Sequence, residues 1–353
     1  MTDSDNPPMI IALVTPYYIP SVRGNAITVQ RIESGLRDHG LTVRVFTLER
    51  ESPQAIAAGL EAFRPQIVHG FHATATGPLV AEASRRLGVP AVLTLTGTDV
   101  NHDLFDPARR ATVLGAVQAV QAVVVFHESV RTLLVRDLPP VGSRVHIIAQ
   151  AVRCDEEAYD LRTKLGLEPD DFVFFQSAGI RPVKNIPSVI PPLTRLQARH
   201  PRLKYVLAGP VLDDQEGARV REMLRDLPWA FYLGPLTHGE VCAVLTQVEV
   251  VLNCSLSEGG MSNAVLEAMS KGVPVLASDI PGNRSIIQDG ADGFLYASEA
   301  AFLARAEALL TQPARREAMG HRARQKIAAR FHPAEEIGGH LALYRSLLGA
   351  AGA

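Results

Sequence analysis

Short apolar runs alternate with longer stretches of helical period, and this alternation occurs twice along the chain. The runs are nearly continuously apolar and rich in β-formers, as expected of strands buried on both faces of a parallel sheet. They comprise residues 10–14, 43–48, 67–71, 91–95, 123–126 and 145–148, then 172–177, 205–208, 231–233, 248–252, 273–277 and 294–296. A charged stretch at 154–171 separates the two sets. The sequence therefore predicts an α/β protein with two doubly wound, Rossmann-like domains.

The domain bounds follow from this restart. We expect a disordered tail over 1–8, a first domain over 9–158, a second over 159–330 and a final segment over 331–353. In the final segment one helical stripe is apolar, formed by Ile337, Leu341, Tyr344 and Leu348, and it needs a partner. The stripe packs either on the second domain alone or on the first. We predict that it crosses back to the first.

Composition excludes several classes of protein. The 353 residues are enough for two cores, and the formal net charge of −2 provides no field that recruits nucleic acid or anionic lipid. The N-terminus lacks the pattern of a signal peptide, and no apolar run approaches the ~18 residues of a membrane span. We expect a cytoplasmic protein with neither nucleic-acid nor membrane partners.

The three cysteines are widely spaced, with no Cys-x-x-Cys pair. Cys154, Cys242 and Cys254 cannot all pair with one another. This pattern favours a reducing compartment and predicts neither a disulfide framework nor a zinc site.

The most informative stretch for function is 257–269. Glu258 closes a buried strand, two glycines follow, and Ser262 or Asn263 is placed to cap the next helix. Glycines remove Cβ bulk, so backbone N–H groups at a helix start can approach an anion or sugar hydroxyls. Carboxylates on either side, Glu258 and Glu267, suit a ligand with vicinal hydroxyls. The alternative is an ordinary strand–turn–helix with capping carboxylates.

Two cations follow the predicted strand 172–177. Arg181 can bind a diphosphate through two parallel hydrogen bonds, and Lys184 can act as a point charge. The alternative is a solvated loop. Taken with the glycine turn, however, the pair provides sites for both a diphosphate and a sugar, which are parts of one nucleotide sugar.

Polar residues also follow three predicted strands of the first domain: Gly24-Asn25, His72 and Thr98-Asp99. Gly24 lets backbone approach a ligand, and His72 can hydrogen-bond a sugar hydroxyl. His72 is otherwise a packed or surface histidine. Asp99 either orients His72 or caps the following helix. No histidine spacing suggests metal ligation, and there is no Asp-x-Asp.

These motifs resemble the signature of glycosyltransferase family 4. The resemblance rests on the Glu258–Glu267 turn and its continuation through 271–279, on the Arg181 and Lys184 pair, and on the strand and glycine at 207–210. Within the family, two groups look nearest, the animal glycosyltransferase 1 domain-containing proteins and the selenosugar synthases, through Gly24-Asn25, Gly97-Thr98-Asp99, 181–184 and 280–282. One feature departs from the pattern. Eight residues separate Glu258 from Glu267, where the family places seven, which leaves the role of Glu258 open.

The resemblance implies a GT-B fold, with two domains facing each other across a cleft. It implies retaining, metal-independent transfer from a nucleotide sugar, expected to be a UDP-sugar, to an unidentified small soluble acceptor, without a cofactor. The implied donor-binding residues are Arg181, Lys184, Gly209, Glu258, Gly259, Gly260, Met261, Ser262, Asn263 and Glu267. The implied acceptor-side residues are Gly24, Asn25, His72, Thr98 and Asp99, and the transfer chemistry falls to His72, Glu258, Arg181 and Lys184. The alternatives are a nucleotide-sugar 2-epimerase of the same fold and a catalytically silent binding module.

Overall fold

The computed structural model describes residues 8–21, 24–258 and 260–351. The chain divides into two compact units, one of Met1–Ala151 with Pro333–Ala353 and one of Val152–His332. The second unit begins earlier than the expected 159, because the segment before it is held within that unit. The Val152 amide donates to Phe331 O at 3.1 Å, and the Glu157 amide donates to Gly239 O at 3.1 Å. Of the expected tail 1–8, only residue 8 lies in the described part.

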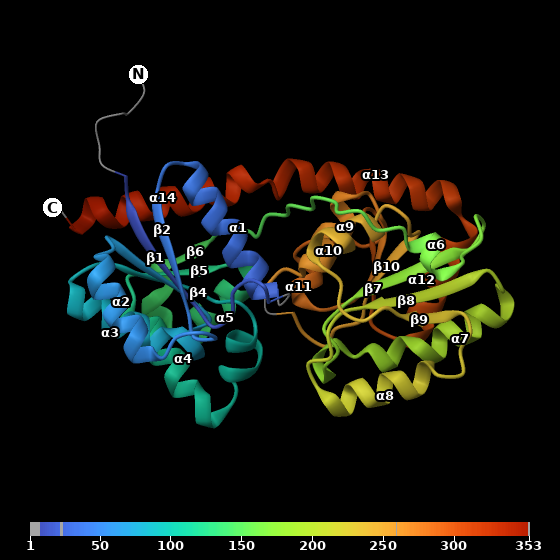
Figure 1. Ribbon diagram of the computed structural model, residues 1–353, viewed down its shortest axis with the longest axis horizontal. Coiled ribbons are helices and arrows are strands. Elements are labelled where there is room, and N and C mark those ends of the chain that lie inside the picture. Colours follow the sequence, from blue (N-terminus) through green and yellow to red (C-terminus); the bar gives the residue numbers. More distant parts are fainter. Residues whose placement is uncertain (1–7, 22–23, 259, 352–353) are drawn as a thin grey trace, which may run out of the picture. The chain divides into compact units, whose positions relative to one another are not determined.

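The first unit contains a six-stranded parallel sheet in the order β2-β1-β3-β4-β5-β6 (Figure 1). Its strands are β1 Ile10–Thr15, β2 Thr42–Thr47, β3 Ile67–Phe71, β4 Ala91–Thr94, β5 Ala122–Val125 and β6 Val145–Ile147. Every apolar run predicted for the first domain forms a strand, because strands covered on both faces need apolar residues at consecutive positions.

Helices cover both faces of this sheet. They are α1 Gly24–Asp38, α2 Pro53–Phe63, α3 Ala73–Leu87, α4 Pro107–Ala119, α5 Glu128–Asp137 and α14 Pro333–Ala351, with short turns η1 Asp99–Asp103 and η2 Pro139–Arg144. Residues of α2 to α5 belong to one apolar cluster, while α1 and α14 contribute to the other. Alternate residues of strands β1 to β5 point into the two clusters, as the pleat requires.

The last helix, α14, packs on the first unit. Ile337, Leu341 and Tyr344 of the predicted stripe are buried in the cluster that α1 and β1 also form. The two helices approach so closely at Gly35 that a Cβ there would lie 2.4 Å from Ile337 Cγ1. Arg31 of α1 donates two hydrogen bonds, of 2.7 and 2.9 Å, to the buried carboxylate of Glu336. Helix α14 is therefore an integral part of the first unit.

The second unit repeats the plan with strand order β12-β11-β10-β7-β8-β9, all parallel. Its strands are β7 Phe172–Ser177, β8 Leu203–Ala208, β9 Ala230–Tyr232, β10 Val250–Asn253, β11 Val275–Ser278 and β12 Phe294–Tyr296. The strand order reverses between β7 and β10. Doubly wound sheets bind ligands outside the carboxyl ends of their strands at such a reversal.

The helices of the second unit are α6 Leu161–Leu165, α7 Ile190–Arg199, α8 Asp214–Leu224, α9 His238–Val244, α10 Asn263–Ser270, α11 Pro281–Arg284, α12 Glu299–Thr311 and α13 Pro313–Arg330, with turns η3 Pro182–Lys184 and η4 Ile186–Val189. None of the helices in the described residues is long and apolar enough to cross a membrane.

The expectation that the cysteines form no disulfide is wrong. Cys154 and Cys242 form one within the second unit, with their Cα atoms 5.5 Å apart, and Cys254 is free and buried. These two residues lie 88 positions apart in the sequence. Their pairing depends on the folding of the segment after Ala151 onto α9, which spacing alone does not indicate.

Candidate functional site

The loops after β7 and β10 meet at the reversal of the second sheet. Lys184, at the end of η3, places its Nζ 2.5 Å from Glu258 Oε1, and the side chains are only 17% and 13% exposed. Arg181 begins the same turn, since the Lys184 amide donates to Arg181 O at 2.9 Å. The Arg181 side chain is exposed, and no carboxylate in the described part of the chain pairs with it. The two predicted cations therefore lie on one turn, one paired and one open.

Glu258 is the centre of a hydrogen-bond network. Its Oε1 also accepts from Ser255 Oγ at 2.7 Å and from Asn253 Nδ2 at 3.3 Å. Burial acts to raise the pKa of the Glu258 carboxyl, but the charge of Lys184 and these hydrogen bonds outweigh it and lower that pKa. Glu258 is therefore an ionised acceptor at neutral pH. Its carboxylate has capacity for further donors, because it offers about four lone-pair sites.

The start of α10 is arranged differently from the predicted capped helix. Ser262 occupies the N-cap position, yet its hydroxyl makes no cap hydrogen bond. Instead Asn253 Nδ2 donates to Ser262 Oγ at 2.9 Å, so Ser262 joins the network of Glu258. The sequence allowed Ser262 or Asn263 to cap the helix; the structure uses the Ser262 side chain to brace β10.

Two glycines allow close approach at this edge of the sheet. A Cβ at Gly282 of α11 would lie 2.7 Å from Glu258 Cβ and 2.8 Å from Gly260 O. At Gly209, after β8, φ is +143° and a Cβ would lie 2.0 Å from Ala178 O. The predicted Gly209 thus lets the loops after β7 and β8 touch. Because Gly282 has no side chain, α11 can pack directly against the turn that carries Glu258.

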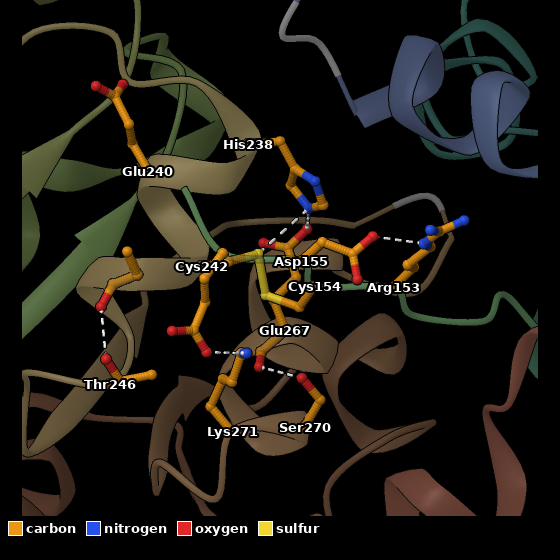
Figure 2. The surroundings of a disulfide bond; sticks show 12 residues. Arg153, Cys154, Asp155, His238, Glu240, Cys242, Thr246, Glu267, Ser270 and Lys271 are labelled. Atoms are coloured by element: carbon orange, nitrogen blue, oxygen red, sulfur yellow. Dashed lines mark hydrogen bonds and ion pairs between the residues drawn. A yellow bond between two sulfur atoms is a disulfide. The ribbon is translucent and has the colours of Figure 1, made fainter. Parts of the chain in front are cut away.

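Glu267 lies in the second turn of α10 and is buried. Its Oε1 lies 3.0 Å from Nε2 of His238, the first residue of α9 (Figure 2). His238 was missed at the sequence level. A signal was nevertheless present, because Thr237 and Glu240 form a capping box that starts a helix at His238. Met261 and Gly260 are buried, Asn263 is half-buried, and Gly259 lies outside the described residues.

In the first unit, His72 follows β3 in an unusual conformation. Its φ of +77° is rare for a residue with a side chain, and such strain is often found at functional sites. The Ala75 amide donates to His72 Nδ1 at 3.3 Å. In neutral His72 the ring proton therefore lies on Nε2, which is a hydrogen-bond donor.

Asp99 braces backbone and does not orient the imidazole of His72. It is fully buried, and its oxygens accept from the amides of Ala73 at 2.9 Å and Gly97 at 2.6 Å. These bonds connect the start of α3 to the loop after β4. The sequence left two roles open for Asp99, orienting His72 or capping the following helix. Its contacts support neither, because they hold the start of α3, which precedes Asp99, and the loop around Asp99 itself.

The side-chain amide of Asn25 is buried without a hydrogen-bond partner among the described residues. Both polar atoms of its side chain are buried and lack a hydrogen-bond partner within the described residues. A buried amide left unpaired costs about 1–3 kcal/mol, so an external polar group is expected here. Gly24, which precedes it, is exposed at the start of α1, and Thr98 is exposed at the start of η1.

An apolar pocket of about 380 Å³ also lies in the first unit, between α2 and α3. Leu48, Ala57, Pro78 and Leu79 are among its lining residues. None of the predicted site residues that the structure describes lines it, so the polar strand ends and this pocket are separate features.

Part of the chain is similar to a known protein family. Residues 159–326 match the family model for glycosyl transferases group 1. This match spans most of the second unit, including the Arg181, Lys184, Glu258 and Glu267 positions. The second unit is therefore similar to group 1 glycosyltransferase domains.

The solved structures establish the fold. Anabaena HepE in complex with UDP and glucose superposes with a TM-score of 0.81 at 15% identity, covering 96% of this chain and 100% of that one. Sucrose-phosphate synthase from Thermosynechococcus elongatus gives 0.83 at 17% identity, covering 97% and 100%. The chain has the GT-B fold, with two Rossmann-like domains.

Among curated proteins, glycosyltransferase 1 domain-containing protein 1 of Xenopus tropicalis is 29% identical over 228 residues. The match covers 62% of this chain and 65% of that protein. The chain spans less than two thirds of the length of the first curated relatives it matches. This homology agrees with one of the two resemblances noted in the sequence.

Proposed function

We propose that the protein is a retaining, metal-independent glycosyltransferase, similar to family 4, that moves a sugar from a UDP-sugar to a small soluble acceptor. The observation that carries the proposal is the Lys184–Glu258 pair beside Arg181, at the strand reversal of a unit that matches the model for group 1 glycosyl transferases. The HepE structures with UDP and glucose and with UDP-glucose make UDP-sugars the first donors to test.

In the proposed donor complex, the diphosphate binds Arg181 and Lys184. Lys184 has three N–H donors and can hold Glu258 and a phosphate oxygen together. Glu258 and the backbone of 260–263 hold the donor sugar, and Glu267 holds the ribose hydroxyls. The Lys184 charge keeps Glu258 ionised and able to accept hydroxyl hydrogen bonds.

The chemical problem is the charge that develops on the departing diphosphate while the sugar becomes oxocarbenium-like. Fixed donors aimed at such charge are worth about 3–4 kcal/mol each in other enzymes. Arg181 and Lys184 supply this stabilisation without a metal in our proposal. Retention follows from front-face attack, with a donor phosphate oxygen taking the acceptor proton. His72 Nε2–H and the amide of Asn25 hydrogen-bond sugar or acceptor hydroxyls.

The test begins with thermal shift against UDP-, GDP- and ADP-sugars. A ligand at 100 times its Kd stabilises the folded state by about 2.7 kcal/mol. Donor turnover is then followed with and without a panel of small acceptors, in excess chelator. We expect a UDP-sugar to stabilise the protein and transfer to need an acceptor but no added metal. Epimerisation of the donor, or binding without any turnover, contradicts the proposal, as does activity that only manganese or magnesium restores.

A further inference from the structure

Three metal-ligand side chains converge at the start of α9. His238 and Cys242 lie one helical turn apart, which places them on the same face of the helix. Cys154 reaches them from the segment after Ala151 (Figure 2). One ligand atom from each residue lies within 4.8 Å of the other two. Two sulfurs and an imidazole nitrogen are a ligand set typical of zinc.

Contacts other than the disulfide hold Cys154 in this place. The Glu157 amide donates to Gly239 O at 3.1 Å, and Thr237 Oγ1 donates to Glu157 Oε2 at 2.6 Å. Lys271 Nζ lies 2.6 Å from Glu156 Oε1. The segment is thus attached to α9 and α10 on the residues that directly follow Cys154. Opening the disulfide would therefore leave the two thiols close together.

We propose that the reduced Cys154–Cys242 pair and His238 Nε2 form a zinc site. Tetrahedral zinc, with Zn–S near 2.3 Å and Zn–N near 2.0–2.1 Å, places sulfur and nitrogen about 3.6 Å apart. Cys242 Sγ and His238 Nε2 are 3.9 Å apart. The two sulfurs must separate to about 3.8 Å, which side-chain rotation can achieve. The fourth position is left to a solvent molecule, because Glu267, whose Oε1 lies 3.0 Å from the same nitrogen, is assigned to the ribose in the proposed donor complex.

Reduction of the Cys154–Cys242 disulfide requires a reductant, and an external dithiol can supply the electrons. The dithiol breaks the S–S bond, becomes a disulfide itself, and leaves two thiols on the protein. Zinc then displaces two thiol protons to solvent, and the two thiolates neutralise its charge. His238 gives up its hydrogen bond to Glu267 and coordinates through Nε2. Soft sulfur ligands favour zinc over magnesium or manganese. This zinc has no part in the proposed transfer step.

The experiment measures metal content. Protein reduced without oxygen is loaded with zinc chloride and desalted, and bound zinc is measured by mass spectrometry. We expect about one zinc per chain. C154S and C242S should lose it, and H238A should weaken it by about tenfold or more in competition with a chromophoric chelator. The controls C254A and H321A remove the other thiol and an exposed histidine of the same unit, and they should retain the zinc.

Cobalt binding provides a second readout that uses only wild-type protein, so it does not depend on whether a variant folds. Reduced wild type loaded with cobalt should show sulfur-to-metal charge-transfer absorption, which alkylation of its thiols abolishes. Reduced wild type that retains no zinc, or C154S that binds zinc as tightly as wild type, overturns the proposal. Both results are independent of donor turnover, so failure here leaves the proposed function intact.

Discussion

At the scale of single residues, the proposed diphosphate site depends on Lys184. Removing it takes away a charge that the diphosphate needs and leaves Glu258 without its counter-ion. We expect K184A and R181A each to weaken UDP-sugar binding by more than about tenfold, since a charge-assisted hydrogen bond contributes about 1.5–3 kcal/mol. Isothermal titration with the donor found by thermal shift measures this.

The matched control is K326A. Lys326 is also 17% exposed and pairs with a carboxylate, that of Asp292, at 2.7 Å, but it lies on α13. K326A should lose stability comparably and bind donor as wild type does. If K184A binds donor normally, the diphosphate lies elsewhere.

The second prediction at this scale concerns the substitution G282A and its effect on donor affinity. In G282A the new methyl group would press on backbone at Gly260 O and at Glu258 O, 2.8 and 3.0 Å away, and flexible side chains cannot relieve this. The Glu258 turn must therefore move. We expect donor affinity to fall several-fold while the unit stays folded, as measured by titration and circular dichroism.

Gly338 provides the comparison, because a Cβ there meets nothing within 4 Å and the residue lies inside α14. G338A should raise stability by about 0.5–1 kcal/mol and leave donor affinity unchanged. Equal donor affinity in G282A and wild type would show that donor binding does not depend on the close packing at Gly282.

At the scale of elements, α14 is attached to β3 by buried polar groups. His69 of β3 places Nδ1 2.6 Å from Tyr344 OH, and the His340 ring lies 5.4 Å from the His69 ring. Burial lowers the pKa of His340 to about 4 and that of His69 well below its usual range. Glu336 acts to raise the pKa of His340, and Arg31 acts to lower it. The packed helix therefore requires both histidines to be neutral.

The free energy of unfolding should therefore depend on pH. Below about pH 6.5 the unfolded chain binds a proton at His340, whereas the folded chain binds that proton only near pH 4. The free energy of unfolding therefore falls as the pH drops from about 6.5 to about 4. For His340 alone the loss is about 2 kcal/mol at pH ~5. Urea denaturation at about pH 7 and pH 5 should show H340L losing correspondingly less than wild type. The exposed His321 offers the control H321L, and equal losses in all three proteins contradict the prediction.

At the scale of the whole molecule, the first unit is assembled from both ends of the chain. The chain leaves it after Ala151 and returns after His332. A chain ending at residue 332 lacks the buried Ile337, Leu341, Leu343 and Tyr344, each worth about 1.5–3 kcal/mol. It also leaves Arg31 unpaired in a largely buried place. Because domains have about 5–15 kcal/mol of stability, we expect this unit to unfold.

Limited proteolysis with peptide mapping distinguishes the two units. In the truncated chain, residues 152–332 should remain protected and residues before 151 should be cut, with donor turnover lost. A chain shortened only to residue 348 keeps these buried side chains and should behave as wild type. Protection of both units in the longer truncation would show that α14 is dispensable.

Much of the candidate site could be anticipated from local pattern. Lys184, Glu258 and Ser262 were selected because polar residues and glycines follow buried strands, and parallel strands bring their carboxyl ends to one edge. The prediction that Glu258 closes a strand is wrong, because β10 ends at Asn253 and Glu258 lies in the loop after it. The direct contact between Lys184 and Glu258 could not be read this way, because the two residues are 74 positions apart. His238 was missed because its partner, Glu267, comes from another helix 29 positions later.

The sequence by itself determined the two parallel sheets and the position of polar residues after their strands. Burial of a strand on both faces, and the period of a helix, are encoded within a few consecutive residues. Only the tertiary structure decided which distant groups pair: Cys154 with Cys242, His238 with Glu267, and Arg31 with Glu336. Such pairs form when whole elements pack, and the separation of two residues along the chain carries no information about their distance in space.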